Sequence, residues 1–200
     1  MPVIQPRADI PEDLIWRMGV EQYHAMVNAG ILTDDDPVEL LEGWLVYKMP
    51  KKPSHRVTAR LVRTALEALV PMGWYVDSQE PITLADSEPE PDVVVVRGST
   101  RQYLDRHPGP KDVGIVIEVS DTTLQRDRET KLRAYARSGI PIYWIVNLVE
   151  QQIEIYSQPD TERAAYRHQD NYALGDTFSV GLERSVLGEI SVSSIFPVTD

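Results

Sequence analysis

The sequence contains no cysteine among its 200 residues. Without thiols, the chain can form neither disulfide bonds nor thiolate metal sites. It also has no apolar run approaching the ~18 to 20 residues that a membrane-spanning helix needs, which argues against a membrane protein. Its first residues, Met-Pro-Val-Ile-Gln-Pro-Arg, lack the charged and apolar regions of a secretion signal. We therefore expect a cytoplasmic protein.

Positive charge is scarce in this chain, which carries 20 Lys and Arg against 31 Asp and Glu, a net charge of −11. This argues against a simple nucleic-acid-binding protein, because such proteins usually present a basic surface. The basic residues nevertheless gather in two clusters: Lys48, Lys51, Lys52, His55, Arg56, Arg60 and Arg63, and then Arg126, Arg128, Lys131, Arg133 and Arg137. Each cluster taken alone is compatible with a solvated helix face, but a local positive field can oppose the negative net charge.

Length and composition indicate one globular domain, with 42% hydrophobic and 26% charged residues, and such a chain can bury a substantial core. We predict an N-terminal arm over residues 1–18 and a single domain over residues 19–200. The fold class is α/β, in the form of a mixed α+β sheet: a central mixed β-sheet flanked by helices. Helices are predicted over 19–29, 53–71 and 124–138, and strands over 38–49 (a hairpin around Glu42-Gly43), 74–76, 82–84, 93–96, 115–117, 140–148 and 153–156, with edge strands in the tail 166–196.

Two acidic residues interrupt runs that are otherwise apolar and β-branched. Asp92 precedes the run Val93 to Val96, and Glu118 follows Ile115 to Ile117. Such runs are typical of strands buried on both faces, where an unpaired carboxylate is costly. Two adjacent strands could bring Asp92 and Glu118 within reach of one Mg²⁺ ion, which prefers carboxylate oxygens. For Asp92 alone, a Pro-Asp turn at a strand start is an equally good interpretation.

A lysine follows on the next predicted helix. The spacing places Asp127 and Lys131 four residues apart on one face, where they could form an ordinary surface ion pair. If Asp92 and Glu118 bind a metal, however, the three residues together indicate metal-dependent phosphodiester hydrolysis. In that reaction, a cationic side chain such as Lys131 near the phosphate stabilises the charge that develops in the transition state. The backbone carbonyl of Val119 is a further candidate metal ligand. Arg128, on the neighbouring stripe, is a weaker candidate than Lys131.

These motifs resemble the putative restriction endonuclease family of the PD-(D/E)xK nuclease superfamily. The resemblance rests on the order of Glu-Pro-Asp, Ile-Glu-Val-Ser and the segment from Arg-Asp-Arg-Glu-Thr-Lys to Ile-Tyr-Trp-Ile-Val, with Val-Glu-Leu-Leu-Glu-Gly-Trp-Leu-Val upstream. It spans roughly residues 20–157. The resemblance implies a restriction-endonuclease-like core that uses Mg²⁺, with Mn²⁺ as a substitute, to cleave DNA.

The resemblance also assigns individual residues. It implies that Asp92 and Glu118 bind the metal, and it matches Glu39 to the acidic residue of the family's hairpin, ahead of Glu42. His55 falls where the family's second helix often carries a histidine. The superfamily places a lysine two residues after the second acid, where this chain has Ser120. The family is similar in lacking that lysine and in carrying one on the following helix, which implies that Lys131 is the migrated equivalent.

The leading hypothesis is therefore a Mg²⁺-dependent endonuclease acting on DNA. The first alternative is a catalytically inactive nuclease-fold binding or interaction module, favoured by the negative net charge and the missing lysine at position 120. The second is a hydrolase that uses two carboxylates as general acid and base, and it would remain active in a chelator. A homodimer is expected because Tyr143, Trp144 and the later strands offer more apolar surface than one small sheet needs.

Overall fold

The computed structural model describes residues 14–33 and 35–197, so the predicted arm over 1–18 and the run of aspartates at 34–36 lie partly outside the described residues. In this part of the chain, no helix is long and apolar enough to cross a membrane. The helical elements are α1 (Val20–Asn28), α2 (Pro53–Glu67), η2 (Thr100–Tyr103), η3 (Pro110–Asp112), α3 (Leu124–Arg126), η4 (Asp127–Lys131), α4 (Leu132–Arg137) and α5 (Val192–Ile195). The strands are β1 (Val38–Leu41), β2 (Trp44–Tyr47), β3 (Trp74–Asp77), β4 (Val93–Arg97), β5 (Val113–Ser120), β6 (Ile142–Asn147), β7 (Gln152–Asp160), β8 (Ala165–Ala173), β9 (Thr177–Leu182) and β10 (Ser185–Ser191).

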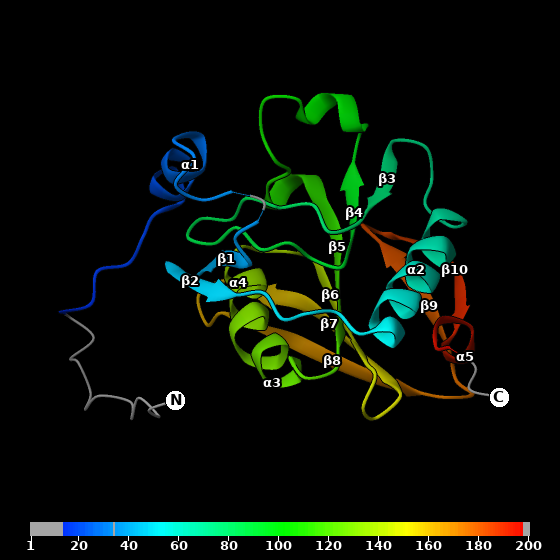
Figure 1. Ribbon diagram of the computed structural model, residues 1–200. Helices are drawn as coiled ribbons and strands as arrows, with labels where there is room; N and C mark the ends of the chain where they lie inside the picture. Colours follow the sequence, from blue (N-terminus) through cyan, green and yellow to red (C-terminus); the bar gives the residue numbers. More distant parts are fainter. Residues whose placement is uncertain (1–13, 34, 198–200) are drawn as a thin grey trace, which may run out of the picture.

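A six-stranded mixed sheet forms the centre of the molecule (Figure 1). Its strand order is β3-β4-β5-β6-β7-β8, in which β5 and β6 are parallel and the other neighbouring pairs are antiparallel. The parallel pair needs a crossover connection, and the helical segment from α3 to α4 supplies it. This confirms the predicted mixed α+β fold with a central sheet flanked by helices.

Both faces of the sheet are covered, which explains why β4, β5 and β6 are almost wholly apolar. One face packs against α2, the β9–β10 hairpin and α5 (Figure 1). The other face packs against α4, whose buried residues are Ala134, Tyr135 and Ala136. Every residue of β5 is buried. Any polar side chain on this strand must therefore find its partners inside the protein.

Two expectations about local structure are wrong. Residues 82–84 are not a strand, although Ile82 and Leu84 are buried. The tail contributes one edge strand, β8, but β9 and β10 form a separate two-stranded sheet that covers the core. A short strand that covers a face has the same alternating pattern as an edge strand, so the sequence could not separate the two.

The helix predicted over 124–138 is present but irregular. Its central part, η4, is a π-helical segment between α3 and α4. Segments of this kind often mark functional sites, because the wider turn redirects the side chains that it carries. Both Asp127 and Lys131 lie in this segment, and both are buried.

Candidate active site

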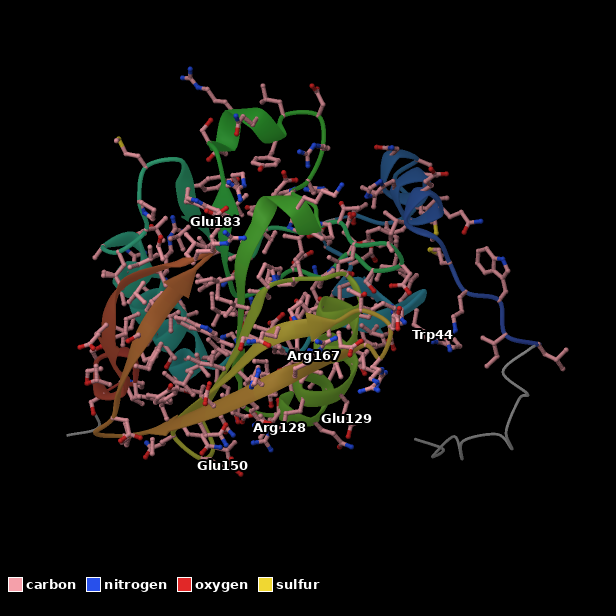
Figure 2. The ribbon with its side chains drawn as sticks, turned by 180° about the vertical axis from the view of Figure 1, so that it is seen from behind. Trp44, Arg128, Glu129, Glu150, Arg167 and Glu183 are labelled. Atoms are coloured by element: carbon pink, nitrogen blue, oxygen red, sulfur yellow. The ribbon has the colours of Figure 1, made fainter. Side chains whose placement is uncertain are left out.

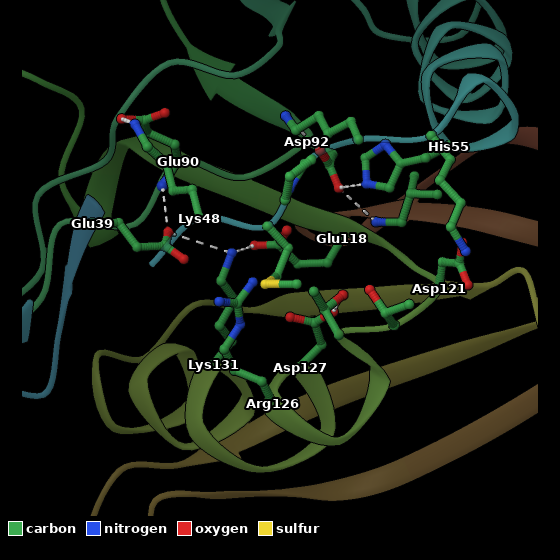
Figure 3. A pocket seen from close by; sticks show the side chains of 17 residues that line it. Glu39, Lys48, His55, Glu90, Asp92, Glu118, Asp121, Arg126, Asp127 and Lys131 are labelled. Atoms are coloured by element: carbon green, nitrogen blue, oxygen red, sulfur yellow. Dashed lines mark hydrogen bonds and ion pairs between the residues drawn. The ribbon is translucent and has the colours of Figure 1, made fainter. Parts of the chain in front are cut away.

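Strand register brings the two predicted acids together. In the antiparallel pair of β4 and β5, Val93 faces Ile117, so Asp92, immediately before β4, is next to Glu118. The backbone N–H of Val119 donates a hydrogen bond to Asp92 Oδ2 at 2.9 Å. Asp92 and Glu118 are each 4% exposed and line one pocket, shown in Figure 3. The pocket therefore holds two buried carboxylates from adjacent strands.

Asp92 is held as an anion by groups that precede or begin α2. His55 Nε2 lies 3.0 Å from Asp92 Oδ2, and Lys51 Nζ lies 3.1 Å from Asp92 Oδ1. Burial acts to raise the pKa of Asp92, but the hydrogen bond and charge of His55, the charge of Lys51 and the N–H of Val119 outweigh it, so the pKa is lowered. The second ring nitrogen of His55, Nδ1, is buried and has no hydrogen-bond partner among the described residues.

Glu118 has the opposite balance. Burial, together with the negative charges of Asp92, Asp127 and Glu39, raises its pKa to about 8 despite the opposing charge of Lys131. Lys131 Nζ and the hydroxyl of Tyr135 both donate to Glu118 Oε1, each at 2.7 Å. No hydrogen bond from the described residues reaches the other oxygen, Oε2.

Lys131 lies between two glutamates rather than in solvent (Figure 3). Its ammonium is 2.7 Å from Glu118 Oε1 and 3.6 Å from Glu39 Oε2. Burial acts to lower the pKa of Lys131, but the charges of Glu118, Glu39 and Asp127 outweigh it and raise the pKa. The lysine is therefore a cation fixed in the pocket.

Asp127 is not the surface partner of Lys131 that its spacing suggested. It is 2% exposed, and its Oδ2 accepts hydrogen bonds from the hydroxyls of Ser120 at 2.7 Å and Thr123 at 2.6 Å. Ser120, which occupies the position of the superfamily lysine, thus anchors the π-helical segment that carries Lys131. The interpretation as an exposed ion pair was wrong because it assumed a regular helix lying on the surface.

The β1–β2 hairpin places Glu39, and not Glu42, in the pocket. Glu39 is 2% exposed and accepts a hydrogen bond from the backbone N–H of Glu90 at 3.3 Å. Glu42 lies in the turn with φ +49°, followed by Gly43 with φ +80°, a combination typical of tight hairpin turns. The carboxylate of Glu42 pairs with Arg133 and Arg137.

Only some residues of the two basic clusters line the pocket. Arg128 is directed away from it, to Glu154 and Glu150, and Figure 2 shows Arg128 close to Glu150. The charge of the pocket is nevertheless nearly balanced, in contrast to the net charge of −11. Its charged lining residues are the acids Glu39, Glu90, Asp92, Glu118, Asp121 and Asp127, and the bases Lys48, Lys51, Lys52, Arg126 and Lys131, with His55.

The donor groups decide which cation could fit. No three His, Cys, Asp or Glu side chains within residues 14–33 and 35–197 form a ready group of metal ligands, which does not suit the multi-ligand cages of zinc. Mg²⁺, in contrast, is commonly held by one or two carboxylates and keeps several water ligands. Asp92 and Glu118 provide two such carboxylates. Burial is the largest cause of the raised pKa of Glu118, and the negative charges of Asp92, Asp127 and Glu39 add to it; these neighbouring charges are what would attract a cation.

The sequence does not predict two residues that contact the expected acids. Lys51 belongs to a basic cluster, a pattern that gives no sign of its contact with Asp92. Tyr135 donates to Glu118. The signal for Tyr135 was its spacing, four residues after Lys131 on a helix.

Comparisons with known proteins identify the family and the fold. The sequence model of the family described as Uma2, putative restriction endonuclease, matches residues 20–189. No curated protein matches the chain. Among solved structures, the chain is similar to the crystal structure of a putative nuclease belonging to DUF820 from Anabaena variabilis, with a TM-score of 0.67 and 14% sequence identity, over 90% of this chain and 97% of that one. At that identity, the structural likeness shows the fold alone.

Proposed function

The chain belongs to the putative restriction endonuclease family, and from that premise we propose that it is a Mg²⁺-dependent endonuclease that hydrolyses phosphodiester bonds in DNA. The observation that carries the proposal is the meeting of Asp92, Glu118 and Lys131 in one pocket. They come from three separate segments, and each is buried among groups that fix its side chain.

In this proposal, Asp92 and Glu118 hold the cation, with the backbone carbonyl of Val119 as an additional ligand. A bound Mg²⁺ or Mn²⁺ would polarise a phosphoryl oxygen and lower the pKa of a coordinated water. His55 and Lys51 keep Asp92 ionised and oriented, and Glu118 Oε2, which takes no hydrogen bond from the described residues, supplies a coordination position.

Lys131 has a separate role in the proposal. Its ammonium would neutralise charge that develops on the phosphate as the bond breaks, which is where a preorganised donor acts most strongly. Glu39 is a positioning residue, because it contacts Lys131 from the side away from Glu118. Asp127 is likewise a positioning residue, through its hydrogen bonds to Ser120 and Thr123 at the start of the π-helical segment.

A homodimer forms part of the proposal, on a different surface from the one first expected. Tyr143 and Trp144 are 0% and 1% exposed and belong to the core, so they provide no interface. Exposed apolar side chains lie instead at alternate positions on β2 and just after it: Leu45, Tyr47 and Met49. Alternate positions share one face of a strand, and an apolar stripe of this kind is a candidate contact surface.

The test is a Mg²⁺ and Mn²⁺ titration with plasmid and single-stranded DNA as substrates. We expect cleavage by the wild type, loss of cleavage in Asp92→Ala, and loss of both cleavage and calorimetric Mn²⁺ binding in Glu118→Gln. The matched control is Glu88→Gln, which changes another buried glutamate, one that lies outside the pocket and hydrogen-bonds Thr83 and His24. Cleavage that persists in a chelator would instead support acid–base hydrolysis by the two carboxylates.

A second candidate is a nuclease-fold binding module that no longer cleaves. One observation favours it: cationic side chains already pair with both acids, Lys131 with Glu118 and Lys51 with Asp92. Such pairs compete with a metal for the carboxylates. Binding of DNA without Mn²⁺ binding or cleavage would decide for this second function.

A further inference from the structure

A groove along α2 opens directly beside the candidate active site. It is lined by Lys51, Lys52, Pro53, Arg56, Val57, Arg60, Leu61 and Gln79. Lys51 and Lys52 also line the pocket that contains Asp92 and Glu118. The groove and the pocket therefore adjoin at these two lysines, and a chain-like ligand that reaches the pocket could extend into the groove.

The groove contains two arginines that lack protein partners. Within the described part of the chain, Arg56 and Arg60 form no ion pair and no side-chain hydrogen bond, and both are exposed. The next arginine on the same helix, Arg63, pairs with Glu67 at 2.8 Å. In a chain with 31 acidic residues, leaving two neighbouring arginines without an acid produces a local positive field that opposes the net charge.

The arrangement of the two arginines suits a repeating anionic ligand. Arg56 and Arg60 are four residues apart on α2, so they lie on one face about 6 Å apart along the helix axis. This separation is comparable to that of adjacent phosphates along one strand. The planar guanidinium group also offers paired N–H donors that match phosphate oxygens better than a lysine ammonium does.

Gln79 completes the groove from another segment. It adopts a left-handed backbone conformation with φ +61°, which is uncommon for a residue other than glycine. Its backbone N–H bonds the carbonyl of Pro91 at 3.0 Å, and Pro91 directly precedes Asp92. This bond holds the backbone of Gln79 close to the acidic site, and its exposed side chain lines the groove, where the amide can donate to a phosphate or sugar oxygen.

We propose that this groove binds the phosphodiester backbone of the substrate on one side of the bond to be cleaved, with Arg56 and Arg60 each contacting a phosphate. The inference rests on the proposed function, because it assigns the substrate path to the same site. A polynucleotide fits better than an acidic protein segment because the groove adjoins the pocket proposed for phosphodiester chemistry, and because the arginine spacing matches a regular backbone.

The experiment compares the wild type with the double variant Arg56→Ala/Arg60→Ala. Fluorescence anisotropy in a chelator measures binding to labelled DNA and RNA oligonucleotides, single-stranded and duplex, over a range of salt concentrations. Cleavage in Mg²⁺ gives kcat and KM. The matched control is Arg101→Ala/Arg184→Ala, which removes the same charge from two exposed arginines that lie outside the groove.

We expect the groove variant to bind more weakly and to lower the slope of log K against log salt by about one unit per arginine. In cleavage, KM should rise while kcat stays close to that of the wild type. The control variant should match the wild type in both measurements. Comparing the DNA and RNA arms identifies which polynucleotide the groove prefers.

The failures of the two proposals are distinguishable. If the wild type cleaves DNA but the groove variant behaves as the control does, the groove assignment is overturned and the nuclease function stands. If the groove arginines govern binding but no cleavage occurs, the groove assignment stands and the nuclease function falls. If polyglutamate binds equally well with the same dependence on the two arginines, the ligand is an acidic protein and the inference is overturned. The inference is also overturned if the wild type neither binds nor cleaves a polynucleotide.

Discussion

At the scale of single residues, the candidate site is built from charges that hold one another in place. Lys131 contacts Glu118 and Glu39, and Asp92 contacts Lys51, His55 and the Val119 N–H. A buried charge without a partner would be costly. Each group therefore depends on the next, and removal of one member should change the protonation of its neighbours before it changes the fold.

Lys131→Met tests this arrangement. The substitution keeps similar volume but removes the ammonium from between two glutamates, and because that ammonium is the charge that opposes the rise in the pKa of Glu118, this pKa should rise further. We expect kcat to fall by about 10²-fold or more, as when one transition-state donor is removed, with circular dichroism unchanged. Lys131→Arg should restore little activity, because the planar guanidinium does not fit the position of a compact ammonium.

The control for this prediction is Lys111→Met, which changes an exposed lysine outside the pocket. Full activity in Lys131→Met would contradict a role for the ammonium in the reaction. Loss of folding in Lys131→Met, seen as a lost thermal transition, would show that the lysine is structural.

The sequence predicted the residues of the site better than their partners. Asp92 and Glu118 were identifiable because each interrupts an apolar run, and Glu39, His55 and Lys131 because of a resemblance in order and spacing. The contacts from Lys51 to Asp92 and from Tyr135 to Glu118 depend on how α2 and α4 pack on the sheet. That packing is a tertiary property that no local pattern encodes.

At the scale of elements, the π-helical segment η4 decides where the side chains of the central helix point. Arg128, which belongs to this segment, makes a bidentate contact with Glu154 on β7. Glu154 is 1% exposed. Glu154 also accepts hydrogen bonds from Tyr156 at 2.8 Å and Asn147 at 3.2 Å. This cluster connects the segment that carries Lys131 to the strands beneath it.

Glu154→Gln should destabilise the protein by about 2 kcal/mol at neutral pH, because it removes charge-assisted hydrogen bonds. Burial acts to raise the pKa of Glu154, but hydrogen bonds from Arg128, Tyr156 and Asn147 outweigh it and lower the pKa. A carboxylate with a lowered pKa in the folded state stabilises the fold above its unfolded pKa, about 4.3. That contribution is lost as pH falls through the folded pKa.

The measurement is urea unfolding of wild type and Glu154→Gln at neutral pH and at several values below about pH 4.5, near the unfolded pKa of glutamate. The difference in unfolding free energy should shrink as pH falls. A difference that stays constant with pH would mean that the carboxylate charge contributes nothing to the stability of this cluster.

Elements with strong periodicity or turn signals were predictable. The hairpin around Glu42 and Gly43, α2, β4 and β6 appear close to their predicted bounds, whereas β5 and β7 are present but extend well beyond the predicted 115–117 and 153–156. The β9–β10 hairpin was misassigned as edge strands because alternation shows that a strand has one buried face, but not which layer covers it. The π-helical segment was also missed, since one extra residue in a turn leaves no mark in a helical pattern.

At the scale of the whole molecule, the uneven distribution of charge and apolar surface determines what the protein can contact. The net charge of −11 should repel a polyanion over most of the surface, so any contact with DNA would be confined to places where cations gather. The α2 groove is such a place, and it adjoins the nearly charge-balanced pocket. The exposed apolar stripe of Leu45, Tyr47 and Met49 borders the pocket, because Met49 also lines it.

This geometry gives the predicted dimer a specific interface. A two-fold axis through the stripe would bury Tyr47, which is 74% exposed in the single chain, against the same surface of its partner. It would also place the two pockets near one another, as cleavage of both strands of a duplex requires. We expect light scattering at micromolar concentration to give twice the mass of the 22.7 kDa chain.

Tyr47→Lys should shift that mass to the monomer, because it replaces an apolar contact with two like charges that face each other across the axis. Met72→Lys is the matched control, since Met72 is fully exposed and lies apart from the stripe. A monomer mass for the wild type would remove the dimer from the proposed function. A dimer that tolerates Tyr47→Lys would move the interface elsewhere and leave the stripe without a role in assembly.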